Sequence, residues 1–285
     1  MLSASHESTL GPVAAELGVI QGAYVLLVTF DSNVWRPVGD PARFPNDPMH
    51  TSFVKINGAL RSGQIEGRLS ETVFTLEGIA RADRKNLLSG YKSKVSFTEE
   101  ELPDGTIHLG FSIGPDLTAH PGNNSYLSSH LNDALALGFK LMRCHRVAGL
   151  INRDIKAEWY AQTSIPTTEV ANKFGEVGRK IEGAGAGIAW VKSIGMANAQ
   201  PAEHWLQGLA KAPPTEDKAI ATAVAEWADG DMVSAHVGYQ NHYICTRDTA
   251  KAAGSNSVFS LLNRAWLERD YGIKFVSPVE LENLV

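Results

Sequence analysis

Four acidic residues lie beside segments that have the hydrophobic pattern of strands or helices. They are Asp31, Glu77, Asp231 and Asp248. Asp31 follows the apolar run at residues 23–30 and Asp248 follows a strand-like run at residues 243–246, whereas the other two lie in or open helix-like stretches. Ligands of open parallel sheets bind beyond the carboxyl ends of the strands, so we expect acids from distant parts of the chain to meet there. Clustered carboxylates suit Mg²⁺ or Mn²⁺, and the first hypothesis is therefore a metal-dependent phosphodiesterase.

The elements that would position these acids alternate between strand-like and helix-like segments. Strands are expected at residues 24–30, 68–69, 242–246 and 272–277. Helices are expected at residues 6–19, 49–60, 71–88, 124–147, 167–194, 201–212, 215–228, 231–240 and 257–271, with a proline-rich loop at residues 31–48. Because strand-helix-strand connections join parallel strands, the pattern predicts an α/β fold with an open, mainly parallel sheet flanked by helices.

A different pattern begins near residue 92. Apolar residues recur at every second position on either side of an Asp104-Gly105 turn signal, which predicts a β-hairpin. They are Val95, Phe97, Ile107, Leu109 and Phe111. We therefore expect residues 92–200 to form an inserted hairpin and helical subdomain, and residues 1–91 and 201–285 to form one domain around a shared sheet.

Composition limits the kinds of protein that this chain can be. The 285 residues carry a net charge of −5, and the pI near 6.0 argues against a protein that coats nucleic acid through its overall field. A binding groove would have to be locally basic. The best candidate is the run Arg81, Arg84, Lys85, Lys92 and Lys94, for which a solvated surface is the other interpretation.

Cysteine usage and hydropathy indicate a compartment. The two cysteines, Cys144 and Cys245, have neither metal-type nor disulfide-framework spacing. No apolar run is long enough to span a bilayer, and residues 1–10 lack the pattern of a signal peptide. We therefore expect a cytoplasmic protein that does not enter a membrane.

Five short motifs follow one another along the chain. They are Asp31-Ser32-Asn33 after an apolar strand, a helix-like stretch from Ser70-Glu71 to Glu77, a helix opened by Asp231, a strand ending in Thr246-Arg247-Asp248, and a last strand followed by Ser277-Pro278. In this order the motifs resemble those of PIN-domain proteins. The two late acids are 17 residues apart, which fits the family. The resemblance covers roughly residues 22–90 and 215–285, and residues 92–200 then correspond to a large insertion.

The resemblance implies a PIN-like catalytic domain with Mg²⁺- or Mn²⁺-dependent endonuclease activity, on RNA more than on DNA. Asp31 would ligate the metal directly, Asp231 and Asp248 would hold it or a second ion, and Glu77 would bind metal or orient the attacking water. Three polar residues would orient these carboxylates: Ser32, Asn33 and Thr246. Candidates for substrate contacts are Arg81, Arg84, Lys85 and Arg247. An inhibitory protein partner or a homo-oligomer is also expected, and Glu71 competes with Glu77 as the second acid.

Other interpretations remain open. The chain could be a catalytically inactive PIN-like module that binds RNA or a protein partner. Each acid also has an ordinary structural explanation: Asp231 would stabilise a helix start with Asp229 as its N-cap, Asp31 and Asp248 would form turns, and Glu77 would be solvated. The sequence Gly183-x-Gly185-x-Gly187 lacks a preceding strand and a following Lys-Ser/Thr, so it predicts helix packing or a hinge rather than a phosphate site.

Overall fold

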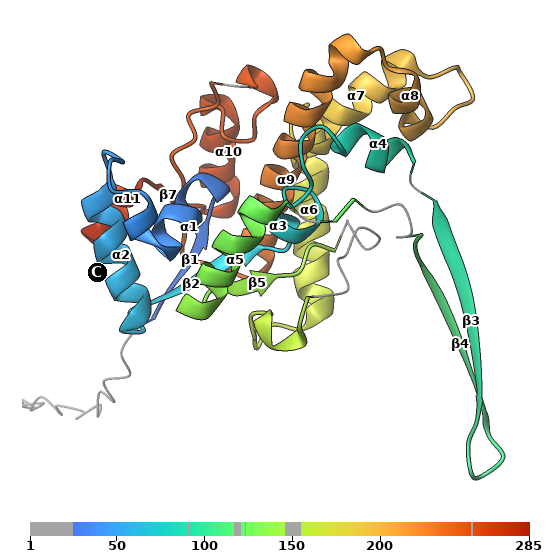
Figure 1. Ribbon diagram of the computed structural model, residues 1–285, viewed down its shortest axis with the longest axis horizontal. Helices are drawn as coiled ribbons and strands as arrows, with labels where there is room; N and C mark the ends of the chain where they lie inside the picture. Colours follow the sequence, from blue (N-terminus) through green and yellow to red (C-terminus); the bar gives the residue numbers. More distant parts are fainter. Residues whose placement is uncertain (1–24, 91, 117–120, 123, 146–154, 252) are drawn as a thin grey trace, which may run out of the picture.

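Five parallel strands form the central sheet of the computed structural model, which describes residues 25–90, 92–116, 121–122, 124–145, 155–251 and 253–285 (Figure 1). In spatial order they are β5 (Lys140–Met142), β2 (Ile65–Ser70), β1 (Leu26–Phe30), β6 (Tyr243–Cys245) and β7 (Phe275–Val276). All four neighbouring pairs are parallel. The predicted α/β class and the mainly parallel sheet are therefore confirmed.

Helices cover both faces of this sheet. The helices of the described residues are α1 (Ser32–Gly39), α2 (His50–Arg61), α3 (Thr72–Thr75), α4 (Arg84–Ser89), α5 (Ser125–Leu137), α6 (Thr167–Gly183), α7 (Ile188–Asn198), α8 (Trp205–Lys211), α9 (Asp217–Gly238), α10 (Leu261–Tyr271) and α11 (Pro278–Glu282). Of these, α4, α7 and α8 pack with α9 in a cluster that contains no strand residue. Short 3₁₀ turns add η1 (Pro41–Arg43), η3 (Ala157–Trp159), η4 (Pro214–Glu216) and η5 (Gly254–Asn256). One core cluster joins the sheet to α1, α2 and α5, and a second joins it to α6, α9 and α10.

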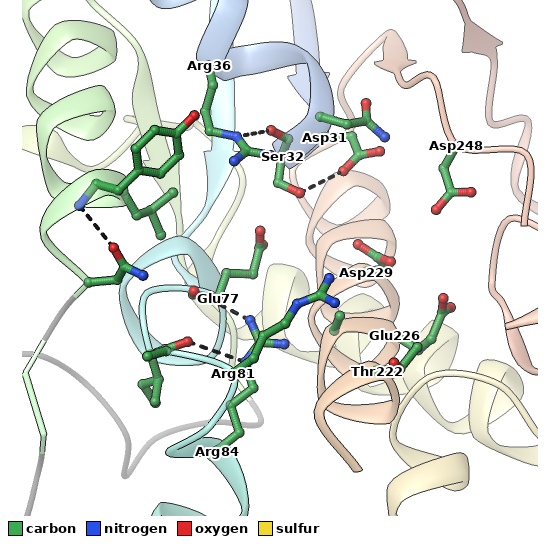
Figure 2. A pocket seen from close by; sticks show the side chains of 17 residues that line it. Asp31, Ser32, Arg36, Glu77, Arg81, Arg84, Thr222, Glu226, Asp229 and Asp248 are labelled. Atoms are coloured by element: carbon green, nitrogen blue, oxygen red, sulfur yellow. Dashed lines mark hydrogen bonds between the residues drawn. The ribbon is translucent and has the colours of Figure 1, made fainter. Parts of the chain in front are cut away.

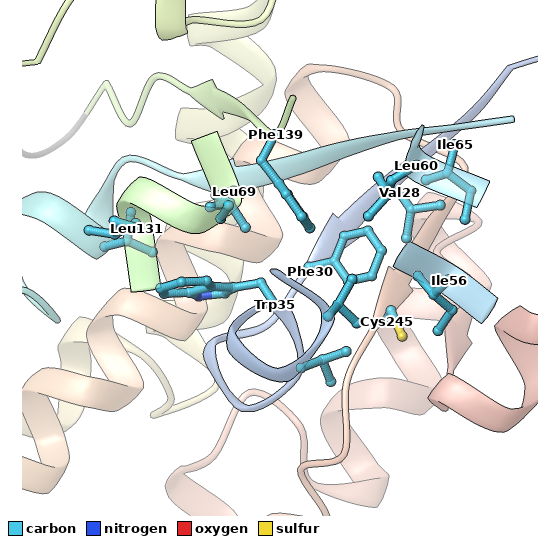
Figure 3. Packing of buried hydrophobic residues seen from close by; sticks show 14 of the residues in the cluster. Val28, Phe30, Trp35, Ile56, Leu60, Ile65, Leu69, Leu131, Phe139 and Cys245 are labelled. Carbon is cyan, nitrogen blue, oxygen red and sulfur yellow. The ribbon is translucent and has the colours of Figure 1, made fainter. Parts of the chain in front are cut away.

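The strand β1 lies at the centre of the sheet, and its residues Val28, Thr29 and Phe30 are buried. Val28 and Phe30 point into the first cluster, where the Phe30 ring packs edge-on against Phe139 with 5.2 Å between centroids (Figure 3). Thr29 points to the opposite face, and its hydroxyl lies 2.9 Å from Nδ1 of His236 on α9. Successive residues of a strand point to opposite faces, so the continuous apolar run reflects burial on two sides.

The strand order creates a crevice at one point of the sheet edge. From β1 the chain builds outward in one direction through β2 and β5, and later in the other direction through β6 and β7. The place where the building direction reverses is called a topological switch point. The connections that leave the two strands at this point run to opposite sides, which leaves room beyond the carboxyl ends of these strands. In this protein those strands are β1 and β6.

Residues 31–48 are not the predicted loop, since they form α1 and η1. Pro41 is the first residue of η1, where the backbone N–H that proline lacks would have no partner within the turn. Pro37 lies inside α1 and cannot donate to the carbonyl of Asn33 four residues earlier. The guanidinium of Arg247 donates to that carbonyl instead. A contact from a distant segment therefore offsets the local helix-breaking signal.

Three predicted helices, at residues 71–88, 124–147 and 167–194, are divided in the structure. Residues 71–88 give α3 and α4, separated by turns around Gly78. Residues 124–145 give α5, which ends at Gly138 with a φ of +102°, and then the edge strand β5. Because β5 belongs to the central sheet and α6 packs along α9, residues 92–200 do not form one separate subdomain.

Two other predicted helices, at residues 215–228 and 231–240, are one continuous helix, α9. Gly230 does not end the helix but allows close packing: a Cβ atom there would lie 3.2 Å from Cα of Gly187. The segment at residues 167–194 is instead divided into α6 and α7, with Gly185 at a φ of +79° and Gly187 at +60° between them. The packing role expected for these glycines fits Gly187.

The predicted hairpin is confirmed as β3 (Ser93–Glu101) and β4 (Ile107–Pro115), which form their own sheet and project from the body (Figure 1). The remaining predicted strands and helices agree with the structure to within a few residues, apart from the helix at residues 6–19, which lies outside the described residues. No helix in the described ranges is long and apolar enough to cross a membrane.

Candidate metal centre

Five carboxylates line a cavity of about 410 Å³ beyond the carboxyl ends of β1 and β6 (Figure 2). They belong to Asp31, Glu77, Glu226, Asp229 and Asp248. The structure thus brings together three of the four acids singled out in the sequence, and it adds two more from α9. Oxygens of Glu226, Asp229 and Asp248 lie within 4.8 Å of one another, close enough to ligate one cation.

Asp31 is held rigidly at the end of β1. Its N–H donates to the Cys245 carbonyl at 3.0 Å, and its Oδ2 accepts a hydrogen bond from the Thr246 hydroxyl at 2.5 Å. The Ser32 hydroxyl lies 3.3 Å from Oδ1. Burial raises the pKa of Asp31, and the negative charge of Asp248 adds to this rise. The hydrogen bond from Thr246 opposes it without cancelling it.

Asp248 is tied to the same hydroxyl after β6. Its N–H donates to Oγ1 of Thr246 at 2.9 Å, and its Oδ1 accepts from the N–H of Ala250 at 2.6 Å. The Arg264 guanidinium donates to its carbonyl oxygen at 2.6 Å. Thr246 therefore links Asp31 to Asp248, which agrees with its expected orienting role.

Glu226 and Asp229 project from one face of α9 because residues three apart in a helix are neighbours. Burial, and then the charges of Asp31, Glu226 and Glu77, raise the pKa of Asp229 well above its ordinary value. Burial raises the pKa of Glu226 to about 7, and the charge of Asp248 contributes. One oxygen of Glu226, Oε2, is buried with no hydrogen-bond partner in the described part of the chain. A divalent cation would neutralise this repulsion and provide the partner that Oε2 lacks.

Asp231 lies outside this cluster, which corrects the site expected from the sequence. It follows Asp229 by two residues, or about 200° around a helix, so its side chain points away from the cavity. Its Oδ2 accepts a hydrogen bond from Nε1 of Trp227 at 3.0 Å, and the residue is almost wholly buried. Recognising α9 as one unbroken helix would have placed Glu226 and Asp229, rather than Asp231, on a common face.

The structure separates the two candidates for the second acid. Glu77 lines the cavity, and burial and the charge of Asp31 raise its pKa, while Arg84 opposes the rise. Glu71 lies elsewhere, where its carboxylate accepts hydrogen bonds from the N–H of Cys144 at 2.5 Å and from the Tyr160 hydroxyl at 2.9 Å. The buried partners of Glu71 give it a role in the packing of the edge strand.

The predicted substrate-binding cations divide into two groups. Arg81 and Arg84 line the cavity, and Arg36 joins them. Lys85 does not line it, because its ammonium contacts Asp217 and the Ala212 carbonyl at 2.8 and 2.7 Å.

Arg247 is also outside the cavity lining. It forms an ion pair with Asp47 at 2.8 Å and supports the carbonyl of Asn33. Asn33 lines the cavity, but its side-chain oxygen accepts from the N–H of Arg247 at 3.1 Å. Arg247 and the Asn33 side chain therefore join the segment after β6 to α1, while the backbone N–H of Asn33 donates to the Asp31 carboxylate and lowers its pKa.

Arg84 combines structural and electrostatic roles. Its Nη1 donates to the Ala221 carbonyl on α9 at 2.8 Å, and its other donors reach the carbonyls of Ile79 and Glu77 at 3.4 and 3.5 Å. Arg81 is exposed at the rim, whereas Arg84 is buried. The cavity thus has an acidic floor and a basic side, the arrangement needed to hold a cation next to a phosphate.

The raised pKa of Glu226 predicts a specific pH dependence of stability without metal. An unfolded glutamate ionises near 4.5, whereas folded Glu226 keeps its proton to about 7. This contribution to stability is fully present below 4.5 and is lost as the pH rises through 7. In EDTA, the free energy of unfolding of the wild type should therefore fall by on the order of 2 kcal/mol between pH 5 and pH 8, relative to that of Glu226→Gln. Urea unfolding at both values measures the difference, and parallel pH profiles for the two proteins would contradict the prediction.

Comparisons of the chain with models of known families, with curated proteins and with solved structures found no match. The strand order and the five carboxylates that the fold brings together are therefore the features that bear on function.

Proposed function

We propose that this protein is a PIN-like, Mg²⁺- or Mn²⁺-dependent endonuclease that hydrolyses phosphodiester bonds, most favourably in RNA. One observation carries the proposal: acids from four separate segments converge at the switch point between β1 and β6. Five carboxylates in one small cavity repel one another, and proteins retain such an arrangement where a divalent cation balances it.

Each group around the cavity then has a distinct task. Glu226, Asp229 and Asp248 would hold the metal, which supplies charge neutralisation and a water of lowered pKa. Asp31 lies in the same cavity, fixed by Thr246, and it would add an oxygen ligand or accept a proton from the attacking water. Arg36 and Arg81 line the same cavity and would neutralise the phosphate of the substrate.

The cavity rim also suggests the form of the substrate. Tyr126, at the start of α5, lines the cavity and leaves 55% of its surface exposed. An exposed aromatic ring beside a phosphate site favours a single-stranded nucleic acid, whose bases are free to stack on it. Both cysteines are buried and free, which agrees with the reducing environment of the cytoplasm.

Replacing Tyr126 by Ala should weaken cleavage of single strands by about 5- to 100-fold in kcat/KM, mainly through KM, because one base-stacking contact is lost. Tyr126→Phe keeps the ring and its edge contact with His130, where the centroids are 4.6 Å apart, and should retain most activity. Kinetics on a labelled oligonucleotide measure both variants. Equal loss in the Phe and Ala variants would exclude stacking.

The proposed function is tested by incubating the full chain with structured and single-stranded RNA and DNA in Mg²⁺, in Mn²⁺ and in EDTA. Cleavage that requires metal and disappears in Asp248→Asn is the expected result, together with a rise in melting temperature on adding Mn²⁺. Binding of RNA without cleavage would instead support the alternative, a catalytically inactive module. Absence of both metal stabilisation and cleavage would overturn the proposal.

A further inference from the structure

The projecting hairpin exposes an apolar face that no other segment of the described chain covers. Five large side chains lie on this face: Val95, Phe97, Ile107, Leu109 and Phe111, with exposed fractions of 49, 76, 55, 78 and 60%. Phe97 and Phe111 pair across the strands with 5.2 Å between ring centroids. They stand at the fifth of nine positions in β3 and β4, so the aromatic pair marks the middle of the hairpin.

A two-stranded hairpin has little stability of its own in water unless its apolar face packs against something. At about 150–200 Å² for each fully exposed side chain of this size, the face offers on the order of 500 Å². Two such faces would bury about 1,000 Å² together, which is the lower limit for a specific protein interface. The area therefore suits a second copy of the hairpin and a weak or transient dimer.

Charge along the hairpin selects the direction of packing. Four acidic residues lie toward the tip: Glu99, Glu100, Glu101 and Asp104. Glu99 and Glu101 share the apolar face, opposite Leu109 and Ile107, whereas Lys92 and Lys94 lie at the base and Lys94 is on the other face. Between residues 95 and 116 there is no lysine or arginine. Tip-to-tip packing would bring the two acidic clusters together. Antiparallel packing separates them and places each acidic tip beside the basic base of the partner.

We infer that the protein forms a symmetric dimer in which two hairpins pack face to face and antiparallel, with Phe97 and Phe111 of each copy at the two-fold axis. An aromatic pair at the middle of the face meets its own copy across a two-fold axis, and the antiparallel direction keeps Glu99 and Glu101 of the two copies apart. The sheets would lie about 10 Å apart. This inference goes beyond the proposed nuclease activity and does not depend on it.

Sedimentation equilibrium of the full chain over a dilution series tests the dimer. The wild type should dimerise with a dissociation constant in the micromolar range, and Phe97→Thr should weaken dimerisation by at least about tenfold, because both copies lose an aromatic side chain. Threonine preserves strand propensity, and circular dichroism checks that the hairpin persists. The matched control is Glu100→Thr on the polar face, which should leave the dissociation constant within about threefold.

Charge reversal tests the direction of packing. Glu99→Lys with Glu101→Lys, and separately Lys92→Glu with Lys94→Glu, should each weaken the dimer about three- to tenfold, and the combined four-residue swap should restore it. Stronger association of the lysine-tip variant would show tip-to-tip packing and overturn the antiparallel arrangement. A wild type that stays monomeric at all concentrations, or that dimerises equally well with Phe97→Thr, would overturn the interface and leave another protein or a nucleic acid as its occupant.

Discussion

Asp229→Asn should reduce metal-dependent cleavage by at least about 100-fold, because it removes an anionic oxygen from the group formed with Glu226 and Asp248. The same change should not destabilise the metal-free protein, since Asp229 is buried among like charges that raise its pKa. Steady-state cleavage in Mn²⁺ and urea unfolding in EDTA measure the two effects. Mn²⁺ should also raise the melting temperature of the variant less than that of the wild type.

Asp231→Asn is the matched control on the same helix. Its carboxylate accepts from Trp227 and lies outside the cavity, so the amide should cost about 1 to 2 kcal/mol of stability and change cleavage less than fivefold. A variant at Asp231 that lost activity as severely as Asp229→Asn, while remaining folded, would contradict the placement of the metal centre.

Leu69→Ala should lower the free energy of unfolding by about 3 kcal/mol or more. Leu69 on β2 has no exposed surface and packs in the cluster that contains Phe139 and Leu131 (Figure 3). Removing its side chain leaves a cavity between the sheet and its covering helices, and the loss of transfer energy adds to the cost of that cavity. Urea unfolding with an unchanged m-value measures the effect.

The same substitution on the surface provides the comparison. Leu262 on α10 is 80% exposed, and alanine has the higher helix propensity, so Leu262→Ala should change stability by less than about 0.5 kcal/mol. Similar losses for the two variants would mean that Leu69 is not part of a well-packed core.

Local sequence signals predicted the elements whose pattern is unambiguous. The hairpin around Asp104-Gly105 has alternating apolar residues on either side of a turn signal, and the central strand β1 and the segment ending in Asp248 are short apolar runs that end at an aspartate or just before one. The prediction failed where a contact from a distant part of the chain compensated for a local signal that usually ends a helix. Pro37 lies inside a helix, where Arg247 donates to the Asn33 carbonyl that proline leaves free. The helices predicted at residues 215–228 and 231–240 are joined in α9, where Gly230 packs closely against Gly187.

The sequence by itself determined the α/β class, the exposed hairpin pattern and the positions of Asp31 and Asp248 after two strands, because these follow from periodicity over a few neighbouring residues. Only the tertiary structure decided that Glu226 and Asp229 join the cavity while Asp231 and Glu71 do not. Which acids face the cavity depends on the rotation of α9 about its axis and on partners such as Trp227 and Tyr160. No short stretch of sequence specifies these contacts. Convergence of charges is a property of the packed chain, because packing alone sets the distances between groups that are remote in sequence.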